Sequence, residues 1–338
     1  MRSFFEHYWI ALLVTFILWA LVGWQLGTAA LITTIILTLL ETTLSADNAV
    51  VNSRVLVKMS PFWQKLFMTV GIFIAVFVVR FALPIVLVMI GAGLDFVTTL
   101  NLALNNPEEY GNKLHSAEPY IHGFGGVFLL LVATHFFVDK TKSVHWLPVE
   151  KYFATLDRFR GAPSVYGLIF FLMTMPFLSE DIRMIVLVSG VAAVILYSTL
   201  HFVTQSIEKG QEGIAHTKHL VGKAAFAAFL YLEVIDASFS LDGVIGAFAI
   251  TNNAVIIMAG LGAGAIWVRE ITLHLVRTQA LVKYKYIESG AQWAILFLSL
   301  VMLVKLFGYE FPEWFIGSIG LGAIVAALIS SHLARSDS

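Results

Sequence analysis

The sequence predicts an all-α fold: a polytopic membrane helix bundle with two inverted three-helix repeats. Three observations lead to this prediction. Hydrophobic residues make up 59% of the chain and charged residues only 13%, against about 25% charged in a soluble domain. The mean hydropathy is +0.84, and long apolar stretches recur along the whole chain. Two similar polar motifs interrupt those stretches. The expected surroundings of such a chain are the lipid bilayer.

Charge and cysteine content exclude several classes of partner and site. The formal net charge is −1, which argues against a nucleic-acid partner, because neutralising phosphates requires an excess of clustered Lys and Arg. There are no cysteines, which excludes disulfides and thiolate metal sites. No H-E-x-x-H, G-x-S-x-G or G-x-x-x-x-G-K-[ST] motif occurs. We therefore expect no protease or other enzyme, no ATP-driven pump and no permanently bound cofactor.

Ten stretches are candidate membrane spans, because a spanning helix needs about 20 apolar residues. The shortest, Val165–Leu178, is short enough to be re-entrant. The candidates are Tyr8–Trp24, Thr28–Val57, Phe62–Ile90, His122–Val138, Val165–Leu178, Ile182–Val203, Val221–Ile250, Asn253–Val276, Gln292–Phe307 and Phe315–Ser330. They divide the chain into an N-terminal helix (1–27), a first repeat (28–138), a loop with two inserted spans (139–220), a second repeat (221–307) and a C-terminal helix with its tail (308–338).

Loop charges predict how the spans are oriented, since Lys and Arg favour the cytoplasmic side. Four loops are basic; they contain Arg54, Lys58 and Lys65, then Lys140 to Arg160, then Lys209, Lys218 and Lys223, then Arg277, Lys283 and Lys285. The intervening loops are acidic or neutral. The two sets alternate without exception if all ten candidates cross the membrane. We therefore expect a multi-pass protein of the bacterial inner membrane with both termini in the cytoplasm.

The two polar motifs align as an internal repeat. "LSADNAVVN" begins at Leu44 and "FSLDGVIGA" at Phe239. When Asp47 is placed on Asp242, the other polar pairs fall into register: Ser45 on Ser240, Glu41 on Asp236, Thr38 on Glu233 and Asn48 on Gly243. The loop charges give the two motif helices opposite directions, and each next helix contains an arginine, Arg80 or Arg269. Inverted repeats of this kind place a transported substrate near the bilayer midplane.

The motif residues are candidate cation ligands. Each carboxylate costs a few kcal/mol in a membrane helix, and carboxylate, hydroxyl and amide oxygens suit hard divalent cations. The candidate ligands are Glu41, Ser45, Asp47, Asn48, Glu233, Asp236, Ser240 and Asp242. Asn52 lies on the same stripe as Glu41 and Ser45 and offers a further amide oxygen. The alternative is an internal salt-bridge network in which Arg80 and Arg269 neutralise Glu41 and Asp236. His135 and His274 are weaker candidates, because a lone membrane histidine is more often hydrogen-bonded between helices.

The aspartates lie off the stripe formed by the other candidates. Asp47 follows Glu41 by six residues, and Asp242 follows Asp236 by six, which is about 120° around a helix of 3.6 residues per turn. Either both aspartates face another partner, or the helices unwind around Ser45–Asn48 and Ser240–Gly243. Broken helices aim carbonyls and carboxylates at ions in transporters.

The motifs resemble those of a known family. "ETTLSADNAVV", "DASFSLDGVIGAF" and "YIESGAQWAI" are similar to the membrane motifs of the TerC family, most closely its DUF475 branch, within the LysE-like transporter superfamily. The resemblance covers roughly Leu31–Val138 and Val221–Phe307. It implies manganese efflux, and the family name comes from tellurite resistance. It also implies ion-site roles for Glu41, Asp47, Asn48, Asp236 and Asp242. The inserted Val165–Val203 segment and the long Gly91–Tyr120 loop depart from the family pattern.

We therefore expect a secondary transporter that exports a divalent cation, with Mn²⁺ as the expected ion and Ca²⁺ as the main competitor. Protons are the simplest coupling ions, because a carboxylate that releases a metal ion can bind a proton. The alternative is a membrane scaffold for metal-stress or tellurite-stress proteins that docks them on the loop from Lys140 to Arg160. The sequence leaves the oligomeric state open.

Overall fold

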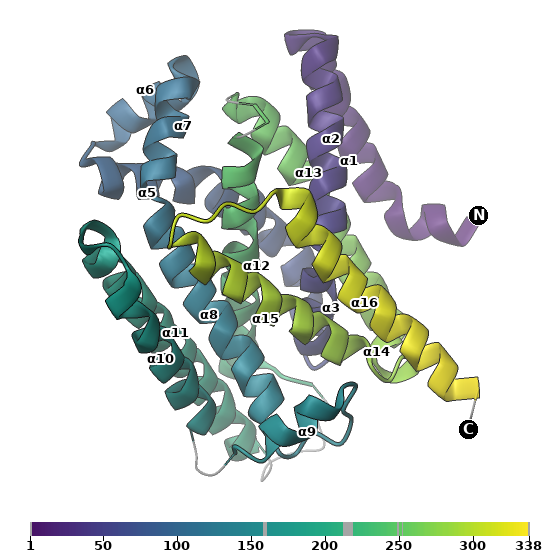
Figure 1. Ribbon diagram of the computed structural model, residues 1–338. Helices are drawn as coiled ribbons and strands as arrows, with labels where there is room; N and C mark the ends of the chain where they lie inside the picture. The colour runs from purple at the N-terminus through teal and green to yellow at the C-terminus, as the bar shows by residue number, and fades with distance from the viewer. Residues whose placement is uncertain (1, 158–160, 212–218, 249, 252, 337–338) are drawn as a thin grey trace.

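The computed structural model describes residues 2–157, 161–211, 219–248, 250–251 and 253–336, and Figure 1 shows the helices that they form. Every element in these ranges is a helix, so the predicted all-α class is confirmed. The elements are α1 (Arg2–Leu26), α2 (Thr28–Leu44), α3 (Ala46–Leu56), α4 (Pro61–Leu66), the π-helical η1 (Phe67–Gly71) and η2 (Ile74–Ala82), α5 (Leu83–Ala92), α6 (Phe96–Asn105), α7 (Pro107–Ser116), α8 (Glu118–Val138), α9 (Pro148–Ala154), α10 (Ala162–Thr174), the 3₁₀ turn η3 (Met175–Phe177), α11 (Glu180–Gln211), α12 (Gly222–Phe248), α13 (Ala254–Arg277), α14 (Ala280–Lys283), α15 (Ile287–Lys305) and α16 (Glu313–Ser336).

The ten predicted spans all correspond to helices in the described part of the chain. Eight helices are long and apolar enough to cross a membrane. A ninth candidate is the pair α2 and α3, which is bent by 50° at Ser45. The shortest predicted span corresponds to Ala162–Phe177, which is apolar but shorter than the others. The chain is therefore a multi-pass membrane helix bundle.

The surface of the bundle is suited to lipid. Large apolar side chains are exposed along the outer helices, including Phe16 at 60%, Met184 at 67% and Val188 at 60%. Exposed apolar area on this scale marks a membrane or partner surface. By contrast, 83% of the residues in the most apolar 18-residue stretch of α8 are buried. α8 packs against α11, α12 and α15. α8 therefore lies at the centre of the bundle.

The segment Gly91–Tyr120, expected as a loop, contains two short helices. Gly93 ends α5 with φ +64°, a conformation that glycine adopts without strain. Asp95 then caps α6 by accepting hydrogen bonds from the backbone N–H groups of Val97 and Thr98. Pro107 opens α7 directly after Asn106. The segment connects two spans, as expected of a loop, and these cap signals give it helical structure that was not predicted.

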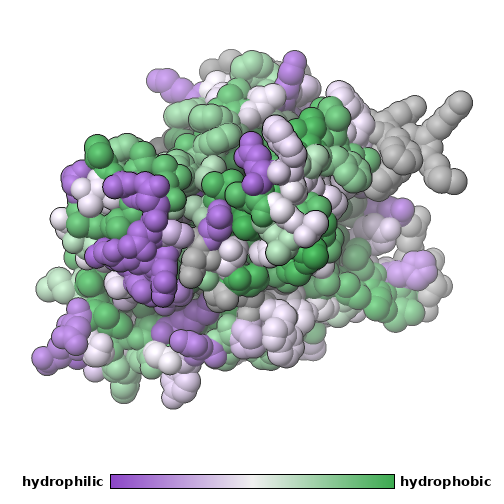
Figure 2. Space-filling model, turned by 90° about the horizontal axis from the view of Figure 1, so that it is seen from above, coloured by the Kyte–Doolittle hydropathy of each residue, from purple (hydrophilic) through white to green (hydrophobic). Residues whose placement is uncertain are grey.

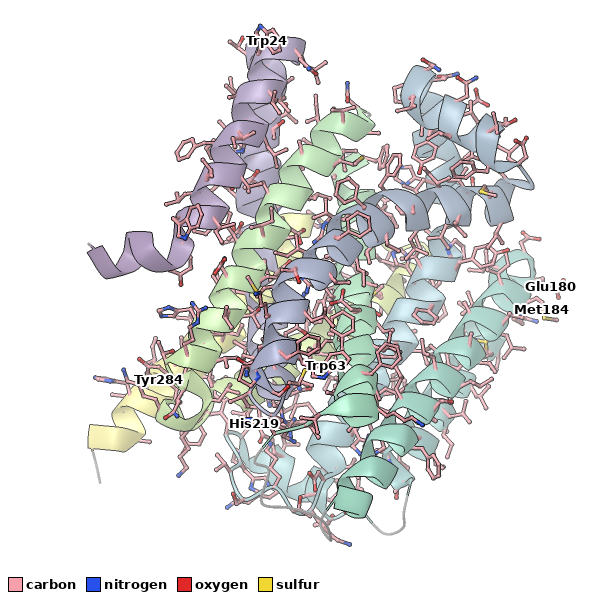
Figure 3. The ribbon with its side chains drawn as sticks, turned by 180° about the vertical axis from the view of Figure 1, so that it is seen from behind. Trp24, Trp63, Glu180, Met184, His219 and Tyr284 are labelled. Carbon is pink, nitrogen blue, oxygen red and sulfur yellow. The ribbon has the colours of Figure 1, made fainter. Side chains whose placement is uncertain are left out.

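The bundle has two ends of different charge. α6 and α7 lie at one end of the bundle, together with Trp24 (Figures 1 and 3). We call this the acidic end, because α7 contains Glu108 and Glu109. α9 lies at the opposite end, together with Trp63, His219 and Tyr284. We call this the basic end, because α9, Trp63, His219 and Tyr284 belong to the four loops that are rich in Lys and Arg. Figure 2 looks down on the acidic end, where the largest group of hydrophilic side chains lies on the left of the view and smaller groups are scattered over a largely hydrophobic face.

A buried carboxylate fastens α9 to the basic end. Glu150 is 0% exposed. It accepts hydrogen bonds from Lys142 Nζ at 2.6 Å, Trp293 Nε1 at 2.9 Å and Ser289 Oγ at 3.2 Å. Burial alone would raise the pKa of Glu150, but the hydrogen bonds from Lys142 and Trp293 outweigh it, and the pKa lies below its usual value. The loop that the alternative scaffold function would use to dock other proteins is thus bound to α15 of its own chain.

We expect labels at Asn112 and Trp146 to report opposite sides of the membrane, since α7 and α9 lie at opposite ends of the bundle. The chain has no cysteine, so Asn112→Cys and Trp146→Cys can be made in the native background. A membrane-impermeant thiol reagent added to sealed right-side-out vesicles should label only Asn112→Cys. Labelling of both variants would contradict the transmembrane orientation of the bundle.

We expect Glu150→Gln to release α9 from α15, because Lys142 then loses its ionic partner in a half-buried setting. Hydrogen exchange over residues 148–154 should rise at least tenfold, while the exposed-site control Glu108→Gln leaves it unchanged. The pKa of Glu150 is lowered in the native chain, so its ionised form stabilises the docked loop at any pH above the unfolded pKa of about 4.3. This contribution is lost as the pH falls below about 4.3 and through the lowered native pKa. Release of the loop between pH 6 and 7 would contradict this assignment.

Candidate functional site

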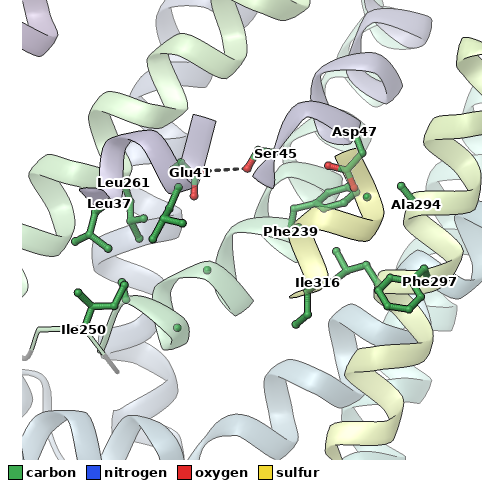
Figure 4. Close-up of a pocket in the computed structure, with 17 residues that line it drawn as sticks. Leu37, Glu41, Ser45, Asp47, Phe239, Ile250, Leu261, Ala294, Phe297 and Ile316 are labelled. Atoms are coloured by element: carbon green, nitrogen blue, oxygen red, sulfur yellow. Dashed lines mark hydrogen bonds between the residues drawn. The ribbon is translucent and has the colours of Figure 1, made fainter. Parts of the chain in front are cut away.

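The first motif forms a break between two membrane helices. α2 ends at Leu44, Ser45 adopts φ −96° and ψ 20°, and α3 begins at Ala46. The hydroxyls of Thr34, Thr38 and Thr42 each donate to the carbonyl four residues earlier, an arrangement that favours helix bending. Ser45 Oγ donates to Glu41 Oε1 at 3.2 Å across the break. The bend therefore sets Glu41 and Asp47 on either side of Ser45, as Figure 4 shows.

A small cavity lies at this break. Its volume is about 70 Å³, room for about two water molecules at ~30 Å³ each. Residues of α2, α3, α12, α13, α15 and α16 line it. They include Glu41, Ser45, Asp47, Phe239, Gly243, Leu261, Ala294, Phe297, Ile316 and Gly320. A Cβ atom added at Gly243 would lie 3.5 Å from Glu41 Oε2, and one at Gly320 would lie 3.5 Å from Asp47 Oδ2. The two glycines thus bring backbone close to both carboxylates.

Glu41 is held by a buried arginine. Arg80 Nη2 donates to Glu41 Oε1, and Arg80 Nη1 donates to the Ala75 carbonyl at 2.9 Å. Arg80 is 3% exposed and Glu41 is 6% exposed. Arg80 lies in the π-helical η2, a backbone form that is frequent at functional sites. One carboxylate of the cavity is therefore already neutralised.

A second arginine binds two carboxylates of the other motif. Arg269 Nη2 donates to Glu233 Oε2 at 3.0 Å and to Asp236 Oδ2 at 3.3 Å. Arg269 Nη1 also donates to the Phe67 carbonyl at 2.9 Å, and the guanidinium lies over the Phe67 ring. All three charged side chains are less than 7% exposed. This cluster joins α12, α13 and the helix that contains η1.

Asp47 differs from the other site carboxylates. It is 5% exposed and accepts a hydrogen bond at 2.9 Å from the backbone N–H of Asn48. Among the described residues no Lys or Arg pairs with it. Asn48 instead connects the two motifs, because its Nδ2 donates to Asp236 Oδ1 at 2.7 Å. α3 therefore contacts both carboxylate clusters.

The structure divides the predicted ligands into two groups. Glu41, Ser45 and Asp47 share the cavity, whereas Asn48, Glu233 and Asp236 gather around Arg269. Ser240 is buried on α12, and the side chain of Asp242 lies outside the described part of the structure. Within the described residues, no group of three or more His, Cys, Asp or Glu side chains could hold a metal ion. An ion in the cavity would also need hydroxyl, amide or water oxygens.

The second motif does not break its helix. α12 continues from Gly222 to Phe248 through Ser240 and Gly243, so unwinding occurs in the first motif alone. A glycine lowers the cost of a break but does not by itself cause one. Of the two histidines singled out, His274 lies beside Tyr8 in a tilted arrangement, with ring centroids 5.8 Å apart. His135 packs on His201 with ring centroids 3.9 Å apart. Neither lines the cavity at Asp47.

A family model described as "Protein of unknown function (DUF475)" matches residues 46–337. The chain belongs to the DUF475 family. Searches of curated proteins and of solved structures gave no match. The matched range begins at Ala46, the first residue of α3, so the DUF475 match includes Asp47 and the whole second motif. Glu41, on α2, lies outside it.

Two further buried amides, Asn52 and Gln292, lie near the site. Asn52 was predicted to lie on the polar stripe as an oxygen donor, whereas Gln292 was not among the predicted ligands. Asn52 is 0% exposed and Gln292 is 2% exposed. The sequence offered a signal for each. Asn52 follows Asn48 by four residues and falls on the same helix face, and Gln292 lies within "YIESGAQWAI". Their proximity to the site is a property of helix packing that the sequence pattern did not specify.

We expect Arg80→Ala to destabilise the fold, because it leaves Glu41 as an unpaired charge in a buried setting. Breaking such a pair costs about 3–5 kcal/mol. The yield of monodisperse protein in detergent should fall, and the double variant Arg80→Ala with Glu41→Gln should recover part of it. Arg183→Ala is the control, since Arg183 binds only the Leu178 carbonyl among the described residues. If the double variant recovers nothing, Glu41 is not the main partner of Arg80.

Proposed function

We propose that this DUF475 protein is a secondary transporter that exports a divalent metal cation, with Mn²⁺ as the substrate. The observation that carries the proposal is the environment of Asp47. A carboxylate without an arginine partner among the described residues lies buried at a break between membrane helices, beside a cavity shared with Glu41 and Ser45. Such a carboxylate is costly in a membrane protein unless a cation or proton neutralises it.

The available ligand atoms favour a hard cation. Glu41, Ser45 and Asp47 offer carboxylate and hydroxyl oxygens, and Asp242 of the second motif stays a predicted carboxylate ligand. Mn²⁺, Ca²⁺ and Mg²⁺ all accept such ligands. Mg²⁺ gives up its water reluctantly and Ca²⁺ prefers 6–8 ligands, so a small cavity with few protein oxygens suits Mn²⁺ best. Cu⁺ and Cd²⁺ gain no thiolate ligand.

The ion pair between Arg80 and Glu41 provides a means of releasing the bound cation. Glu41 binds Arg80 in the present conformation, so a cation that recruits Glu41 must displace the guanidinium. The reverse exchange returns Glu41 to Arg80 and weakens cation binding. Proton coupling follows the same logic, because a proton and a metal ion compete for the lone pairs of Asp47. Exchange of partners at these carboxylates would thus link ion release to protonation.

The motif resemblance supports the choice of ion. "ETTLSADNAVV" and "DASFSLDGVIGAF" resemble the TerC family, whose members are implicated in manganese efflux. The basic end of the bundle is expected to face the cytoplasm. In that orientation both termini and α9 lie inside a bacterial cell, and the cation moves toward the acidic end.

The test is flux into liposomes that contain the purified full-length protein and an ion-sensitive dye. We expect Mn²⁺ flux above Ca²⁺ flux, and Ca²⁺ flux above Mg²⁺ flux. Asp47→Asn and Asp242→Asn should each lower Mn²⁺ flux at least a hundredfold with unchanged yield, because both remove a charged ligand. The control Asp95→Asn changes a helix cap outside the cavity and should keep full flux. Cells that lack the protein should accumulate manganese.

Two results would overturn the proposal. Normal flux in both aspartate variants would place the ion elsewhere. Absence of Mn²⁺ flux in the native protein, together with unchanged cellular manganese, would instead favour the scaffold function.

A further inference from the structure

Three buried amides lie beside the cavity with polar atoms that have no hydrogen-bond partner among the described residues. Asn48, Asn52 and Gln292 are 2%, 0% and 2% exposed. The unpartnered atoms are Asn48 Oδ1, Asn52 Oδ1, Asn52 Nδ2 and Gln292 Oε1. Buried polar groups are nearly always hydrogen-bonded, so each exception needs a physical explanation. Here the three side chains share one feature, an unpartnered carbonyl oxygen.

The packing of α3 against α15 brings these oxygens to one level of the bundle. Asp47 and Ala294 line the same cavity, and Arg54 forms an ion pair with Glu288 one to two turns away. Residue numbers rise along α3 from Asp47 to Arg54 while those of their neighbours on α15 fall from Ala294 to Glu288, so the two helices run antiparallel. Gln292 therefore lies level with the turn between Asn48 and Asn52. Asn48 and Asn52 fall on one face of α3, and Asn48 bonds Asp236 of α12. The amides thus lie where α3, α12 and α15 meet.

A second, larger cavity lies beyond the amides toward the basic end. Its volume is about 310 Å³. We call it the vestibule; its lining includes Val51, Arg54, Lys58, His135, Asp139, Tyr231 and Gln292. The helices α3, α12 and α15 each contribute residues to both the vestibule and the cavity at Asp47. Gln292 itself lines the vestibule, and Asn48 directly follows Asp47 of the smaller cavity, so the amides lie between the two cavities.

We propose that the carbonyl oxygens of Asn48, Asn52 and Gln292 form a transfer site through which the divalent cation passes between the vestibule and the cavity at Asp47. This inference rests on the proposed function and adds a route to it. Amide oxygens are ligands for hard cations, and they are neutral. Conduction requires sites that bind an ion strongly enough for it to enter and weakly enough for it to leave. Three neutral oxygens between charged groups meet both conditions.

Charged groups lie at both ends of this route. Asp139, Arg54 and Lys58 line the vestibule, and Glu288 pairs with Arg54, so Asp139 is the carboxylate that a cation meets there. The guanidinium of Arg54 also lies 5.0 Å from the centre of the Phe136 ring. Beyond the amides the cation meets Asp47. The carboxylates at the two ends attract the cation, and the amides replace part of its water between them.

The test compares Asn52→Leu and Gln292→Leu with the control Thr34→Val, in full-length protein. Thr34 is 0% exposed, and among the described residues its hydroxyl bonds only the Ala30 carbonyl of its own helix. We expect each leucine variant to lower Mn²⁺ flux in liposomes at least tenfold, with thermal stability unchanged or higher, because an unpartnered buried amide contributes no hydrogen bond. Mn²⁺ binding in detergent, followed by electron paramagnetic resonance, should stay within twofold of the native value. Gln292→Glu, which keeps an oxygen, should retain flux that Gln292→Leu loses.

The outcomes separate this inference from the proposed function. Normal flux in both leucine variants, with flux lost in Asp47→Asn, would overturn the transfer site and leave the transporter intact. Reduced thermal stability in the leucine variants would make the amides packing groups and would also overturn the transfer site. Normal flux in Asp47→Asn and Asp242→Asn would overturn the proposed function itself.

Discussion

Neutralising carboxylates inside an apolar bundle is the constraint on which the rest of the structure depends. Removing a charge from water costs several kcal/mol even after relaxation, and Arg80 and Arg269 offset this cost for Glu41, Glu233 and Asp236. The helices pack around these pairs. A Cβ atom at Gly71 would come within 2.3 Å of Arg269 Nη1, and one at Gly264 within 2.5 Å of Glu41 Cβ.

The short helix α3 joins the two arginine clusters. It begins at the break after Ser45, directs Asp47 into the cavity and bonds Asp236 through Asn48. Any exchange of partners at one cluster is therefore connected to the other through a single short helix. A rigid helix with two discrete sets of contacts is the kind of element that can couple an ion site to a conformational change.

Helix existence followed directly from the sequence, whereas helix continuity did not. All ten apolar stretches form helices, because lipid leaves backbone groups no partner other than their own helix. The two motifs look alike in sequence, yet only the first breaks its helix. A short polar motif permits a break, and the neighbouring helices determine whether the freed backbone groups and side chains find partners there.

The sequence by itself determined the class of the protein, its apolar spans and the polar residues placed among them, since these depend on composition and local spacing. The tertiary structure decided which of those residues meet. It paired Glu41 with Arg80 and both Glu233 and Asp236 with Arg269, left Asp47 beside a cavity, and brought Gln292 to the level of Asn48 and Asn52. Such groupings join residues as far apart as Asn48 and Asp236, 188 positions in sequence. They depend on how helices pack across the bundle, and periodicity within one helix contains no information about that packing.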